Sequence, residues 1–185
     1  MAKIENLLKN YERHVSIPWS KTNAGPERVW FAVYEPSEER RLRLRLQNFE
    51  LATAQAEHGW KEIDLTNSFP EWLKNEEYHE SYFAEPESLT YLLPDFLDHL
   101  AAKINDAFST TANADNTVFA LTGLSTLFGV GRISDLIGKL EPKVIGRLLC
   151  FFPGQYVGNT YRFLNARDGW NYLAVPITSE ESIYS

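Results

Sequence analysis

Cysteine is almost absent from this chain, since Cys150 is the only one among 185 residues. No intrachain disulfide is therefore possible. Cys150 lies in the apolar run Ile145–Phe152 and has no apparent catalytic partner there. We expect it to be a buried structural thiol, not a nucleophile.

Positive charge and long apolar runs are also scarce. The chain has 18 Lys and Arg against 25 Asp and Glu, a formal net charge of -7. This excess of acid argues against broad binding to nucleic acid or to an anionic membrane, so we expect no direct DNA contact. No apolar stretch approaches the roughly 20 residues of a membrane span. The first residues lack the apolar core of a secretory signal, which predicts a cytoplasmic protein with no membrane contact.

The composition is sufficient for one hydrophobic core that is stable on its own, because 44% of the residues are hydrophobic. We expect a single α/β domain over residues 1–185, with an N-terminal helix and link at 1–25 and a helical insertion at 71–116. Apolar periodicity predicts helices at 3–14, from Ser37 as N-cap to Gly59, at 69–75, from Leu89 to Phe108, and at 135–140. Buried strands are expected at 28–34, 60–65, 117–122 and 145–152, followed by a hairpin of 161–164 and 170–177 with its turn at 168–169.

Helices and doubly apolar strands thus alternate along the chain. This order predicts a three-layer sandwich around a mostly parallel central sheet, closed by a C-terminal β-hairpin.

In such a sheet, ligands bind outside the carboxyl ends of the strands. This rule predicts a site from the residues that follow the expected strands, namely Glu35, Asp64, Thr122, Gly123 and the Pro153–Gly154 pair. The loops beyond the strands add Arg132, Ser134, Tyr156, Asn159, Arg162 and Arg167.

The glycine-rich loop Gly123–Gly131 fails as a phosphate loop. The motif G-x-x-x-x-G-K-[ST] needs a closer pair of glycines and a lysine, and Val130 stands where the lysine belongs. We expect Ser134 to cap the helix that follows. The sequence therefore predicts no cofactor. An enzyme or sensor that uses a nucleotide, or a metal held by Glu35 and Asp64 on adjacent strand ends, remains the alternative.

Several segments, taken together, resemble the BrxB family of bacteriophage exclusion (BREX) systems, which is a family of unknown function. These segments are Leu121–Phe128, Arg132–Pro142, Phe151–Tyr156 and Asp168–Tyr172, with Val29–Pro36 and Trp60–Leu65 as the earlier strands.

The resemblance implies a non-catalytic core component of antiviral defence. Members act beside a PglZ-like protein of the alkaline-phosphatase fold, a large ATPase and an adenine-specific DNA methyltransferase. The family offers no established catalytic residue to transfer. It also implies a sheet like that of nucleotide-binding proteins without the phosphate loop.

Two hypotheses follow for the loops after the last strands. As an adaptor, the protein would dock a larger partner through aromatic and arginine side chains, a composition typical of interface hot spots; these are Tyr156, Tyr161, Arg162, Arg167, Trp170 and Tyr172. The alternative is that Tyr161, Trp170 and Tyr172 only cover the sheet. The arginines of the segment 40–45 have two interpretations as well, a solvated helix face or a patch that binds an anion or a partner.

Overall fold

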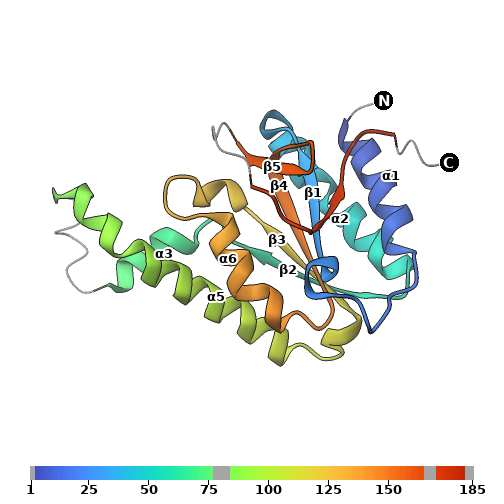
Figure 1. Cartoon of the computed structure of the whole chain (residues 1–185), viewed down its shortest axis with the longest axis horizontal. Helices are drawn as coiled ribbons and strands as arrows, with labels where there is room; N and C mark the ends of the chain where they lie inside the picture. The colour runs from blue at the N-terminus through green and yellow to red at the C-terminus, as the bar shows by residue number, and fades with distance from the viewer. Residues whose placement is uncertain (1–2, 77–83, 165–169, 182–185) are drawn as a thin grey trace.

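The computed structural model describes residues 3–76, 84–164 and 170–181. Figure 1 shows the arrangement of the elements. The helices are α1 (Lys3–Val15), α2 (Glu39–Gln55), α3 (Ser68–Asn75), α5 (Leu93–Thr110) and α6 (Ile133–Leu140). The strands are β1 (Val29–Tyr34), β2 (Gly59–Asp64), β3 (Thr117–Thr122), β4 (Arg147–Val157), β5 (Thr160–Phe163) and β6 (Val175–Ile177). Short 3-10 turns include η2 (Pro36–Glu38), η3 (Pro86–Tyr91) and η5 (Leu124–Leu127).

The central sheet has the strand order β2-β3-β4-β1-β6, and every neighbouring pair in that order is parallel. β5 lies off this path and pairs with β4, antiparallel to it. All six residues of β1 and all six of β3 are buried, as expected of strands covered on both faces. The predicted α/β class with a mostly parallel sheet is confirmed.

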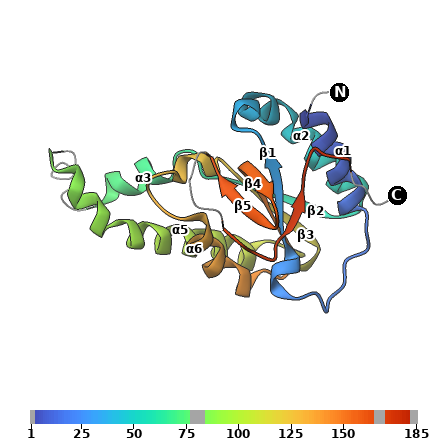
Figure 2. The same cartoon turned by 45° about the horizontal axis from the view of Figure 1, so that its top comes forward.

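Helices cover both faces of this sheet. On one face, Trp30, Ala32 and Tyr34 of β1 pack with the apolar side of α1 and α2. On the other, Phe31 of β1 and Phe119 of β3 belong to the core that also contains buried residues of α3, α5 and α6. Figure 2 shows the two helical groups on opposite sides of the strands. Alternation along the strands therefore builds two separate cores, and the three-layer prediction is confirmed.

α2 begins differently from the prediction. Its N-cap is Glu38, which makes no side-chain capping bond, so Ser37 is not the cap. Ser37 lies instead within the turn η2, because the chain makes a 3-10 turn before the α-helix starts.

Three of the four arginines in the segment 40–45 of α2 form exposed ion pairs. Arg41 lies 3.6 Å from Glu38, Arg43 lies 2.9 Å from Glu39, and Arg45 lies 3.2 Å from Glu5, measured between charged atoms. Such exposed pairs contribute about 0–1 kcal/mol each. Because their charges are already matched, the solvated-face interpretation is favoured over an anion-binding patch.

The largest difference from the prediction is at β4. The strand does not end at Phe152 but continues through Pro153 and Gly154 to Val157, and then turns into β5. Gly158 and Asn159 both have positive φ, 57° and 61°, as a two-residue hairpin turn of type I′ requires.

The C-terminal segment also forms less regular structure than expected. Tyr161 and Trp170 exchange two backbone hydrogen bonds of 2.7 Å, so an antiparallel contact is present there. The chain is a strand again only at Val175–Ile177, which runs parallel to β1 as β6. The predicted turn at 168–169 lies outside the described residues.

The packing of α1 against β1 can be tested through His14. Its ring lies edge-on to Trp30, with 4.5 Å between ring centroids, and burial together with the charge of Arg147 lowers the pKa of His14. The unfolded chain therefore takes up a proton on His14 first as the pH falls. The free energy of unfolding should decrease as the pH falls below about 6.5, by up to about 1.4 kcal/mol per pH unit from this residue.

Urea denaturation of the wild-type protein and of His14→Gln between pH 7.5 and 5 measures this contribution. The variant should lose less stability over that range. Equal pH dependence in the two proteins would show that His14 is not held neutral by its surroundings.

Candidate functional site

The residues predicted from strand ends do share one edge of the sheet, because the strands that they follow are parallel (Figure 1). They do not form one site. β3 and β4 lie between β1 and β2, so Glu35 and Asp64 are three strand spacings apart, about 14 Å. The expectation that these two acids lie on adjacent strand ends is wrong. Among the described residues, no group of three or more His, Cys, Asp or Glu side chains is placed to hold a metal ion.

The crevice between β1 and β4 is the position where an open α/β sheet is expected to bind ligands. The connection from β1 leads to the far edge strand β2, whereas the chain after β4 leads past β1 to β6. A cavity of about 260 Å³ lies here, lined by Glu35, Tyr156 and the extended part of β4. Glu38 and Glu180 also line it, and Lys3 pairs with Glu35. Such an acidic lining repels phosphate groups.

Asp64 is used to shape the turn after β2. Its Oδ1 accepts hydrogen bonds from the backbone N–H of Thr66 at 2.9 Å and from its hydroxyl at 2.6 Å. Partial burial would raise the pKa of Asp64, but these bonds and the charge of Arg43 lower it overall. The carboxylate is therefore held ionised as part of the turn.

Thr122 and Gly123 complete the same network. The Thr122 hydroxyl donates to Glu62 at 3.1 Å. Gly123 has a φ of 75°, and a Cβ there would lie 2.6 Å from the hydroxyl oxygen of Thr66 and 2.9 Å from Asp64. These residues join the ends of β2 and β3 and leave little room for a ligand between them.

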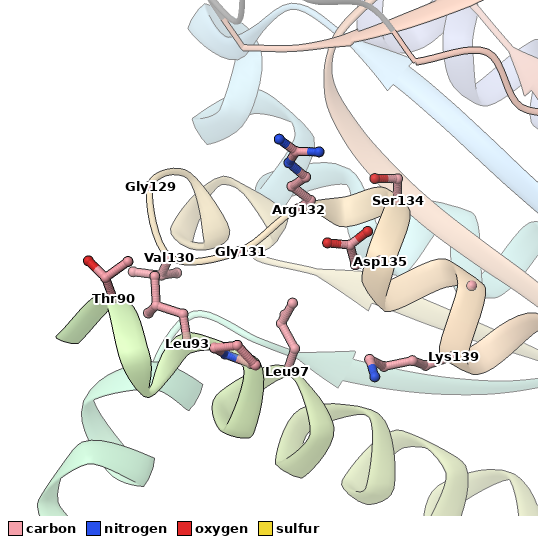
Figure 3. Close-up of a pocket in the computed structure, with 12 residues that line it drawn as sticks. Thr90, Leu93, Leu97, Gly129, Val130, Gly131, Arg132, Ser134, Asp135 and Lys139 are labelled. Carbon is pink, nitrogen blue, oxygen red and sulfur yellow. The ribbon is translucent and has the colours of Figure 1, made fainter. Parts of the chain in front are cut away.

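A larger groove of about 860 Å³ lies between the N-terminal end of α5 and the loop that leads into α6. Figure 3 shows Leu93 and Leu97 on the α5 side, with Val130 in the loop above them. Asp135 and Lys139 project from α6 across the same space. The groove thus has an apolar wall and a polar wall.

The polar wall is built from a partly matched set of charges. Lys139 Nζ lies 2.6 Å from Asp98 Oδ1, while Arg132 is exposed at the start of the wall. Ser134 is inside α6, whose N-cap is Arg132, so the prediction that Ser134 caps this helix is wrong. The helix begins two residues earlier than expected because Ile133 is already buried in the core.

The aromatic residues after β4 belong mainly to the core. Tyr161 is buried and its hydroxyl donates to the carbonyl of Ala174 at 2.7 Å. Trp170 stacks on Tyr172 with 4.8 Å between ring centroids, and lies 5.5 Å from Phe31. For these three residues the covering interpretation is favoured.

The exposed candidates are on the β4–β5 hairpin. Arg162 and Asn159 are exposed, and the half-buried Tyr156 donates its hydroxyl hydrogen to Asn159 Oδ1 at 3.1 Å. Arg167 lies outside the described residues.

Sequence reasoning missed one residue at this edge. Phe128 is 54% exposed, and its ring lies 6.0 Å from that of the half-buried Phe163. Phe128 precedes Gly129 and Val130, which line the groove. A large aromatic residue in a glycine-rich loop was the available signal. We call Phe128, Val130, Arg132 and Phe163, together with the groove beside them, the loop surface.

Cys150 is buried, and burial strongly raises the pKa of its thiol. It is therefore the structural thiol that the sequence predicted, since a thiolate would be required for nucleophilic chemistry.

Comparisons with protein-family models, curated proteins and solved structures found no match to this chain. None of the helices in the described ranges combines the length and the apolar character that crossing a membrane requires.

Gly123 and Gly129 form a matched pair for a stability test. Both have left-handed φ, 75° and 80°, but a Cβ at Gly129 would meet no atom of the described residues within 4 Å. Gly129→Ala should cost only the backbone strain, about 1 kcal/mol. Gly123→Ala should cost about 2–4 kcal/mol, because the added methyl also displaces Thr66 and Asp64.

Urea denaturation of the two variants measures these costs. Equal destabilisation would contradict a tight Asp64–Thr66–Gly123 network.

Proposed function

We propose that this protein is a non-catalytic adaptor of a BREX phage-defence system and that it acts in the cytoplasm. It binds a larger defence protein, the PglZ-like protein first, with the ATPase and the DNA methyltransferase as further members of the assembly. The observation that carries the proposal is the loop surface, where exposed Phe128 lies against Phe163 beside the 860 Å³ groove.

An exposed aromatic ring beside a groove with an apolar wall is a feature of binding surfaces. Scattered exposed apolar residues need no explanation, but a contiguous patch rimmed by charge is typical of protein interfaces. Here the apolar part contains Phe128, Val130 and Leu93, and Arg132 lies at its edge. Aromatic and arginine side chains provide much of the binding energy in protein interfaces.

The segments that resemble BrxB include those that shape this surface. Thr122 and Gly123 set the turn that leads into the loop of Phe128. Gly154 to Tyr156 belong to the part of β4 that pairs with β5, and Gly154 lies opposite Phe163. The resemblance therefore supports a role for this edge of the sheet in the family.

The chemistry of the crevice between β1 and β4 gives less support to a nucleotide-dependent enzyme or sensor. A triphosphate there would face Glu35, Glu38 and Glu180, with the charge of Lys3 already matched by Glu35. Asp64 is engaged in its own turn. Neither acid is free to bind Mg²⁺ in the geometry that phosphate chemistry requires.

The test is co-purification from cells that express the operon with a tag on this chain. The wild-type protein should bring the PglZ-like protein with it. Phe128→Ser and Arg132→Glu should each lower its recovery at least tenfold, because truncation of an interface hot spot costs about 2 kcal/mol or more.

Leu44→Ser is the matched control, since Leu44 is 74% exposed but lies on α2, on the opposite face of the sheet. It should leave recovery unchanged, and circular dichroism should show the same helix content in all variants. Recovery of the defence proteins with Phe128→Ser at the wild-type level would exclude the loop surface. Failure of the wild-type chain to bring any of them would exclude the adaptor.

A further inference from the structure

The opposite, N-terminal edge of the sheet holds a buried arginine. Arg147 is the first residue of β4 and is only 3% exposed. Its guanidinium donates to the carbonyl oxygens of Gly146 at 2.9 Å and Ser20 at 3.4 Å. Within residues 3–76, 84–164 and 170–181, no carboxylate lies at ion-pair distance from it. A buried charge of this kind is costly unless an anion matches it.

Trp19 lies directly against this guanidinium. The Arg147 Cζ atom is 4.6 Å from the centre of the indole ring, and His58 stacks on the same ring at 3.7 Å and 8°. Two groups this close to the centre of one ring must lie on its opposite faces, so the imidazole and the guanidinium both pack on the indole. The indole N–H of Trp19 is buried and has no hydrogen-bond acceptor in the described part of the chain. Among the described residues, this place thus holds a cation with no acid at ion-pair distance and an N–H donor with no acceptor.

These groups line a cavity of about 280 Å³. Its walls include His14, Trp19, Trp30 and Val175, with Arg147 and Glu27 as the charged members. Trp19 and Trp30 meet edge-to-face, with 5.9 Å between ring centroids. The cavity therefore combines apolar walls, a guanidinium and one carboxylate at its border.

We propose that this cavity binds a small organic monocarboxylate with an apolar body, whose carboxylate pairs with Arg147 and whose body lies along the edge of Trp19 and against Trp30 and Val175. A planar guanidinium matches a carboxylate through two parallel hydrogen bonds. Glu27 borders the same cavity and repels a second negative charge, which selects a monoanion over a phosphate dianion. The volume suits about ten non-hydrogen atoms, below the range of drug-sized pockets.

The site is separate from the loop surface. Arg147 and Trp30 lie at the beginnings of β4 and β1, whereas Phe128 and Phe163 lie beyond the carboxyl ends of the strands. The proposal therefore does not rest on the adaptor function. The competing explanation is that Arg147 only fixes the link 16–24 by holding Trp19 and the carbonyl of Ser20.

Cyclohexanecarboxylate is a suitable probe because it has nine non-hydrogen atoms and does not absorb where tryptophan does. Titration at constant ionic strength, followed by intrinsic tryptophan fluorescence, should give a saturable change with a Kd on the order of 1 mM. Cyclohexanecarboxamide has the same shape without the charge and should bind at least tenfold more weakly. Equal responses to the acid and the amide would overturn the proposal.

Two substitutions separate binding from folding. Glu27→Gln keeps an acceptor for the Ala24 N–H, which Glu27 holds at 2.9 Å, but removes the repelling charge. It should tighten carboxylate binding about threefold. Arg147→Gln should weaken binding at least tenfold, with circular dichroism used to confirm that the variant is folded. Unchanged affinity in Glu27→Gln would show that the carboxylate does not bind here and that Arg147 only fixes the link.

A second arm identifies the source of the carboxylate. A hexapeptide that ends in leucine with a free carboxyl group is compared with the same peptide amidated at that end. Tighter binding of the free peptide than of cyclohexanecarboxylate assigns the cavity to a polypeptide terminus. Weaker binding assigns it to a free small molecule. In both cases the effect of Glu27→Gln should be the same.

Discussion

The close approach of β5 to Gly154 is the contact on which the carboxyl edge of this sheet depends. A Cβ on Gly154 would lie 2.0 Å from the carbonyl oxygen of Arg162, so only glycine allows the two strands to pair here. That pairing carries β4 beyond the end of β1, where Tyr34 is opposite Pro153. As a result, the hairpin forms one wall of the crevice that an α/β sheet of this kind leaves open for a ligand. It also brings Phe163 next to Phe128.

The fold was predictable because most of its information is local. Strands that are buried on both faces have continuous apolar sequences. Such sequences predict β1 and β3 to within one residue of their observed ends. The sequence predicts that β4 ends at Phe152, because a Pro-Gly pair such as Pro153–Gly154 ordinarily interrupts a strand. The strand continues because the carbonyl of Pro153 accepts from Leu164 at 2.9 Å, a bond that needs no amide hydrogen from proline.

The candidate site was less predictable because it depends on strand order. Glu35 and Asp64 each follow a strand, and the sequence correctly places both at one edge. The local sequence contains no signal that β3 and β4 lie between β1 and β2 in the sheet. Arg147 was missed for a related reason. It begins an apolar strand at the edge where ligands are not expected, and Trp19, which contacts it, is 128 residues away in the chain.

Burial decides what each residue type means for function. The aromatic and arginine residues after the last strands favour an interface in the sequence, but Tyr161 is fully buried, and only exposed rings such as Phe128 can meet a partner. For charged side chains the relation is reversed, because a buried charge and not an exposed one indicates a place where something binds. The exposed Arg43 has an acid within 2.9 Å and needs nothing further, whereas the buried Arg147 has none at ion-pair distance in the described part of the chain. An exposed apolar group and a buried unmatched charge are each costly to the isolated protein. Both costs decrease when something binds, so these two places, at opposite ends of the strands, are where binding is expected.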